Sequence, residues 1–187
     1  MLKQLYLLLS GLISTPEKTW KTLDGRQETN NEDFYGGYLY PVIGIIALAS
    51  FCGGWTAADG FRLPIALKVV IKETIAYFGG FYLAAHGLYR LSRKHFGLTA
   101  DLLHFERFAG YSSAAIYVVA CVDALFHPLF FLQICTLYTA YIVWHGAGVY
   151  IPVKENDRTK FTIFSSAVII LAPVAVRMVM TLFMPGL

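Results

Sequence analysis

The stretch FYGGYLYPVIGIIALASFCGGWTAA, residues 34–58, contains no charged residue. A membrane-spanning helix needs roughly 20 mostly apolar residues, so this stretch predicts a first crossing over about residues 38–55. Barrel strands alternate in polarity over about ten residues, whereas this stretch is uniformly apolar. We therefore expect an all-α polytopic membrane protein, a five-transmembrane-helix bundle. The four further crossings are predicted at about residues 65–91, 105–126, 129–151 and 161–184.

The composition supports this class. Of the 187 residues, 57% are hydrophobic and 14% are charged, whereas a soluble domain carries about 25% charge. This excludes a soluble enzyme, a disordered chain and a large separate extramembrane domain. We expect residues 1–37 to form cytoplasmic interfacial helices and a linker, and residues 38–187 to form the membrane domain. The net charge is only +3 and there is no basic stripe, so the expected partner is the lipid bilayer and not nucleic acid.

The orientation follows from the basic residues that flank the crossings, because cytoplasmic loops are enriched in Lys and Arg. The opposite side has only Arg62 and Lys68. We therefore expect a cytoplasmic N-terminus and, with five crossings, a C-terminus outside, in a bacterial inner membrane. The basic residues on the N-terminal side are Lys3, Lys18, Lys21, Arg26, Arg90, Arg93, Lys94, Arg107, Lys154, Arg158 and Lys160.

The first 25 residues predict two short amphipathic helices lying in the membrane interface. Apolar residues recur at helical spacing from Leu2 to Ile13. A second helix should begin at Pro16, which suits the first helical position, and end at Gly25, with Trp20 and Leu23 facing the membrane. A signal peptide is the alternative, but no small-residue cleavage site follows the apolar run.

Several ionisable residues fall inside the predicted crossings. At a rise of about 1.5 Å per residue, Lys72, Glu73, Asp123 and Arg177 lie in one layer of the outer half, beside His127. Charged side chains in a spanning helix face a partner or a wet cavity. The layer is therefore either a polar pocket open to the outside or a structural ion-pair cluster, for example of Glu73 with Arg177.

Signatures of catalysis and of cofactor or metal binding are missing. Cys52, Cys121 and Cys135 form no CxxC pair and no zinc-type spacing with histidine. Asp123 lacks an intramembrane aspartate partner, and no metalloprotease or phosphate-loop motif occurs. We expect a protein that is not an enzyme and has no cofactor.

Two functions remain open. Ala76, Gly80 and Ala84 repeat every four positions, and such rows let helix backbones approach closely. This favours a membrane organiser or adaptor that contacts itself or other membrane proteins. The alternative is a small-solute or ion transporter or channel that uses the charged layer.

Short motifs resemble a known family. Asp33-Phe34-Tyr35-Gly36-Gly37, just before the first crossing, resembles an Asp-Leu-Tyr-Gly-Pro signature, with Gly37 where proline is usual. Gly110-Tyr111-Ser112 resembles a Gly-Tyr-Ser signature in the third crossing. With the segment from Leu137 to Gly146 and the helix entry from Pro16 to Trp20, the chain resembles short prokaryotic members of the Yip family, the Ypt-interacting membrane proteins.

The resemblance implies five crossings, a cytoplasmic N-terminus and a non-enzymatic role. Eukaryotic relatives bind Rab-type GTPases and each other, and they act in vesicle trafficking between the ER and the Golgi. Here the N-terminal segment of residues 1–37 is too short for their long extension, which puts small-GTPase binding in doubt.

Overall fold

The computed structural model describes residues 2–25, 31–56 and 63–183. Within these ranges the protein is helical apart from short connections, and it contains no β-strand. The predicted all-α class is therefore confirmed. In chain order the elements are α1 (Leu2–Ser14), α2 (Pro16–Gly25), α3 (Asn31–Phe34), the π-helix η1 (Tyr35–Leu39), α4 (Tyr40–Thr56), α5 (Leu63–His95), α6 (Leu102–Ser112), α7 (Ala114–Leu125), the 3₁₀-helix η2 (His127–Tyr138), α8 (Thr139–Gly146) and α9 (Glu155–Phe183).

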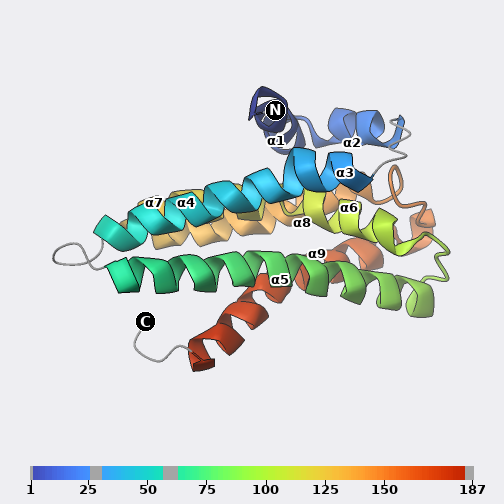
Figure 1. Cartoon of the computed structure of the whole chain (residues 1–187). Coiled ribbons are helices and arrows are strands. Elements are labelled where there is room, and N and C mark those ends of the chain that lie inside the picture. Colours follow the sequence, from blue (N-terminus) through green and yellow to red (C-terminus); the bar gives the residue numbers. More distant parts are fainter. Residues whose placement is uncertain (1, 26–30, 57–62, 184–187) are drawn as a thin grey trace.

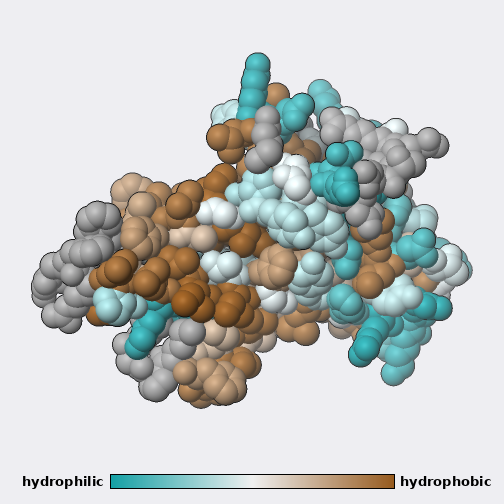
Figure 2. Space-filling model, in the orientation of Figure 1, coloured by the Kyte–Doolittle hydropathy of each residue, from teal (hydrophilic) through white to brown (hydrophobic). Residues whose placement is uncertain are grey.

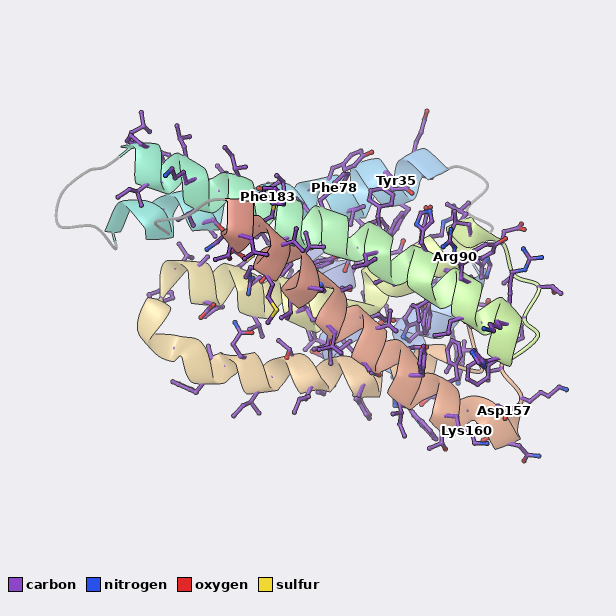
Figure 3. The ribbon with its side chains drawn as sticks, turned by 90° about the horizontal axis from the view of Figure 1, so that it is seen from below. Tyr35, Phe78, Arg90, Asp157, Lys160 and Phe183 are labelled. Carbon is purple, nitrogen blue, oxygen red and sulfur yellow. The ribbon has the colours of Figure 1, made fainter. Side chains whose placement is uncertain are left out.

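The long helices form an elongated bundle, with the N-terminal pair on one side. In Figure 1, α4, α5 and α7 run roughly side by side, and α1 and α2 lie over the start of the α3–α4 helix. Figure 3 shows α9 crossing α5 obliquely, and these two helices pack against each other. Arg90, Asp157 and Lys160 gather at one end in that view, whereas Phe183 lies toward the other.

The crossing of α5 over α9 explains the row of small residues. Ala76 and Ala84 are buried, and a Cβ added to Gly80 would lie 2.6 Å from the backbone Cα of Pro173. Two helices can approach this closely only where a side chain is missing. The row therefore packs within the molecule, so it is not available for contacts with another protein.

By length and composition, Glu32–Gly54 and Glu155–Phe183 can each cross a membrane. The α6–α7 pair adds a third candidate if its two halves act as one span, although they meet at 46°. At this bend Ser113 Oγ donates a hydrogen bond to Ala109 O at 2.7 Å, and such bonds often bend helices. The described residues thus contain two or three candidate spans by this measure.

Two segments differ from the prediction. The expected linker at the end of residues 1–37 ran from Arg26 to Asp33, but Asn31–Phe34 is helical and continues through η1 into α4. The predicted crossing at 129–151 is not one α-helix, because it begins as the 3₁₀-helix η2 and α8 ends at Gly146. Gly148 follows with a φ of +99°, a left-handed conformation that glycine accommodates and that turns the chain.

The N-terminal helices have the expected bounds, since α2 begins at Pro16 and ends at Gly25. The prediction for the apolar face of α2 is wrong, however. Trp20 and Leu23 do not face the membrane but are buried, with exposures of 0% and 3%. They pack in the same core as the bundle residues, so α2 is fixed to the bundle.

The surface divides along the length of the bundle. Figure 2 shows mostly apolar residues over one end, where α4 finishes and α5 begins, and polar residues over the other, around α2, α3 and α6. In this view α1 lies near the change from apolar to polar surface.

Candidate functional site

The two family-like motifs meet in one aromatic cluster, although they are more than 70 residues apart in sequence. At its centre is Phe34, which has no exposed surface. A Cβ added to Gly110 would lie 2.6 Å from Phe34 Cζ, so glycine is needed there to seat the ring. The Phe34 ring also packs against Tyr38, Phe81 and Tyr111, with centroid separations of 6.0, 6.0 and 5.2 Å.

Hydrogen bonds join the same two segments. The Tyr38 hydroxyl donates to the carbonyl of Gly110 at 3.2 Å, and its ring lies 4.9 Å from that of Tyr111. The Tyr35 hydroxyl donates to Glu106 Oε2 at 2.6 Å. Glu106 is 8% exposed, so this bond gives a partner to a carboxylate that is otherwise costly to bury.

The motif residues therefore divide into two groups. Tyr35, Gly110 and Tyr111 take part in the aromatic cluster. Ser112, which follows Tyr111 in the sequence, is buried. The Ser112 hydroxyl has no hydrogen-bond partner among the described residues. Asp33, Gly36 and Gly37 are exposed instead. The buried members join η1 to α6, and the exposed ones remain available to a ligand.

A cavity of about 510 Å³ opens next to the aromatic cluster, beneath the α1–α2 pair. This is a typical size for a ligand site, since small-molecule pockets occupy about 300–1,000 Å³. Its lining combines apolar side chains of α1 with polar side chains of α2 and the first motif. The lining residues are Gln4, Leu5, Leu7, Leu8, Lys18, Thr19, Thr22, Asp33, Gly37, Tyr38 and Tyr111.

Trp20 holds α2 against the bundle. Its indole N–H donates to the carbonyl of Ile142 at 3.0 Å, and its ring lies 5.5 Å from Phe108 and 5.2 Å from Tyr150. A Cβ on Gly146 would lie 2.8 Å from Trp20 Cε2. The sequence placed Trp20 on the apolar face of α2 but gave no local signal for its partners, which come from α6 and α8 and from the segment after α8.

The predicted charged layer is only partly assembled. Arg177 donates to Glu73 Oε2 at 2.6 Å and to the Tyr77 hydroxyl at 2.7 Å, and Lys72 Nζ lies 4.0 Å from Glu73 Oε1. Asp123 instead accepts a hydrogen bond from Gln133 Nε2 at 3.0 Å. The side chain of His127 lies outside the described part of the structure.

The crevice at this charged layer is small. Its volume is about 40 Å³, and Tyr77, Gln133 and Arg177 are among its lining residues. A cavity needs about 10–15 Å³ of such space to hold one water molecule, so the crevice has room for a few. The layer thus contains the Glu73–Arg177 ion pair, with a small crevice beside Arg177. Among the described residues, no group of three or more His, Cys, Asp or Glu side chains could hold a metal ion.

Comparison with known proteins agrees with the motif assignment. A family model described as the Yip1 domain matches residues 10–183, which include both motifs, α2 and all the long helices. No curated protein and no solved structure matches the chain.

Proposed function

The chain belongs to the Yip1 domain family, and from this membership we propose that it is a five-span integral membrane protein that organises other membrane proteins without catalysis. The observation that carries the proposal is the use of the family motifs. Phe34, Tyr35 and Gly110 are engaged in packing and hydrogen bonds between the α3–η1 segment and α6, so these motif positions hold the helices together.

Five crossings require α5 and the η2–α8 segment to span the bilayer as well. The helix α5 has a rise of about 50 Å for its 33 residues, more than the hydrocarbon core of about 30 Å. Its first half exposes an aliphatic stripe but also carries Lys68 and Lys72, and its last turns carry Arg90, Arg93 and Lys94. The stripe consists of Leu63, Leu67, Ile71 and Ile75.

The η2–α8 segment has the length and surface for the fourth crossing. The chain bends at Leu129 inside η2; the nine residues of η2 after this kink and the eight of α8 rise about 18 and 12 Å, at about 2.0 and 1.5 Å per residue. Residues three apart share a face in a 3₁₀-helix, and Phe131, Ile134 and Leu137 are all exposed. They would form a lipid-facing stripe.

With the basic residues on the cytoplasmic side, the polar end of the bundle in Figure 2 faces the cytoplasm. The α1–α2 pair then lies at the cytoplasmic surface of the membrane, where α1 exposes Leu2, Tyr6 and Leu7. Because the small-residue row of α5 is used internally, we propose that partners bind this platform and the exposed stripes.

Site-specific photo-crosslinking in native membranes tests the adaptor proposal. A photoreactive phenylalanine analogue would replace Tyr6 on α1 or Phe131 on η2, which are 70% and 54% exposed. Phe105, which has no exposed surface, is the matched control. We expect discrete protein adducts from the Tyr6 position and none from the Phe105 position. Absence of adducts from both exposed positions, with a monomeric protein, would contradict the proposal.

The second candidate is a small-solute or ion transporter, and the partly buried Lys72, Glu73 and Arg177 favour it. It predicts that Glu73→Gln lowers the flux of ions or solutes into liposomes that contain the protein. Asp24→Asn, an exposed change on α2, is the control. Equal flux in the two variants and in empty liposomes would exclude transport through this layer.

A further inference from the structure

The cavity beneath α1 and α2 lies where an apolar surface meets a polar one. Leu5, Leu7 and Leu8 of α1 form one wall, and Leu7 remains 57% exposed. In Figure 2 the surface changes from apolar to polar near α1. A ligand in this cavity could therefore keep a polar group inside while an apolar part continues along α1 into the lipid.

The polar lining carries one charge of each sign. Lys18 on α2 and Asp33 at the start of the first motif both line the cavity, and both are exposed. Within the described residues neither forms an ion pair. A zwitterionic group with separate phosphate and ammonium charges would satisfy both side chains, whereas a purely anionic group would leave Asp33 facing a like charge.

The threonine hydroxyl groups in the cavity lining narrow the choice of lipid headgroup further. Thr19 Oγ1 donates to the carbonyl of Thr15 at 3.0 Å, and Thr22 Oγ1 donates to that of Lys18 at 2.9 Å. A threonine hydroxyl has a single donor hydrogen, so both oxygens can only accept further hydrogen bonds. With the Asp33 carboxylate they make this lining rich in acceptors, which suits a primary ammonium with three N–H donors and does not suit a trimethylammonium with none.

We propose that the cavity binds the headgroup of phosphatidylethanolamine from the cytoplasmic leaflet. Lys18 would pair with the phosphate, and Asp33, together with the threonine oxygens, would accept hydrogen bonds from the ammonium. The acyl chains would follow the leucine wall of α1. The lipid then fastens the α1–α2 platform to both the first motif and the bilayer.

Lipid retention by the full-length protein tests this assignment. The protein would be placed in nanodiscs with equal parts of phosphatidylethanolamine, phosphatidylcholine and phosphatidylglycerol. The lipids that stay bound to the protein after its release from the nanodisc would be identified by native mass spectrometry. We expect preferential retention of phosphatidylethanolamine. Asp33→Asn should lower its ratio to phosphatidylcholine by about tenfold, the loss of one charge-assisted hydrogen bond. Lys18→Gln should lower the retention of both lipids.

Matched variants on the same helix separate this site from general surface charge. Asp24→Asn and Lys21→Gln change exposed residues of α2 that do not line the cavity, and they should retain the wild-type lipid ratio. Equal retention of the three lipids by the wild-type protein, or preference for phosphatidylglycerol, would overturn the proposal. So would an Asp33→Asn variant that keeps the wild-type ratio. If Asp33→Asn does not fold, as circular dichroism would show, the wild-type lipid preference and the Lys18→Gln variant decide the question.

This inference rests on the proposed orientation of the protein in the membrane, but not on the adaptor proposal. Crosslinked partners could be absent while phosphatidylethanolamine is still retained, and the converse result is equally measurable.

Discussion

Replacing Gly110 by alanine tests whether the two family motifs are coupled by packing. The new Cβ would lie 2.6 Å from Phe34 Cζ, 3.0 Å from Phe34 Cε2 and 3.3 Å from Phe81 Cε2. Carbon atoms prefer separations of about 3.5–4.0 Å, so the Phe34 ring would have to move by roughly 1 Å. The ring is fully buried and packed against aromatic neighbours, which would have to move with it.

The expected change in the free energy of unfolding follows from two opposing effects. Overpacking a well-filled core costs about 1–3 kcal/mol, and the enclosed ring places this site near the upper end. Alanine is favoured over glycine in a helix by about 1 kcal/mol. We therefore expect Gly110→Ala to lower the free energy of unfolding by about 1–2 kcal/mol, measured by denaturant or thermal unfolding in detergent.

Two further variants make this test specific. Gly44→Ala in α4 is the matched control, because nothing lies within 4 Å of its added Cβ, and it should be neutral or slightly stabilising. In a Phe34→Leu background the penalty of Gly110→Ala should shrink, because the smaller side chain leaves space for the methyl group. A Gly110→Ala protein as stable as the wild type, or an undiminished penalty in that background, would refute the packing argument.

Three other substitutions test contacts elsewhere in the bundle. Gly80→Ala should destabilise the protein by about 3 kcal/mol, because its Cβ would lie 2.6 Å from the Pro173 backbone, which cannot rotate away; thermal unfolding measures this. Glu73→Gln should cost about 2 kcal/mol in the same assay, since it weakens a charge-assisted hydrogen bond to Arg177. Trp20→Phe removes a buried hydrogen bond, which should cost about 1 kcal/mol and speed limited proteolysis of α2.

Gly80→Ala and Glu73→Gln each have a matched control. Gly87→Ala should stay close to wild type, because its nearest neighbour is a side-chain atom of Val168 at 3.4 Å. Lys68→Gln changes an exposed charge on α5 and should leave stability unchanged. Equal stabilities for Gly80→Ala and Gly87→Ala would contradict the close helix crossing. Unchanged proteolysis in Trp20→Phe would show that the indole hydrogen bond does not hold α2 in place.

Local sequence signals predicted the N-terminal helices well. Proline at a first helical position and glycine at a helix end act through their own backbone preferences, and α2 begins and ends where they stand. The burial of Trp20 could not be predicted in this way. Its partners, such as Ile142 and Phe108, come from helices far along the chain, and a hydrophobic face looks the same whether it meets lipid or protein.

The contacts within the charged layer could likewise be predicted only in part from the sequence. Helical rise alone placed Glu73, Arg177 and Asp123 at a common depth, but depth does not fix the rotation of each helix about its axis. The structure pairs Glu73 with Arg177 and directs Asp123 to Gln133. The 3₁₀ geometry of η2 also escaped prediction, because an apolar segment carries no strong local preference between 3₁₀ and α-helix. The motifs were identified from sequence, yet only the fold brings Phe34 onto Gly110.

The side of the membrane on which each terminus lies tests the proposed orientation and the odd number of crossings most directly. Reporters fused separately to the N- and C-terminus, one type active only in the cytoplasm and another only outside it, would give both positions in living cells. The account predicts a cytoplasmic N-terminus and an external C-terminus. Both termini on one side would mean an even number of crossings and would contradict it.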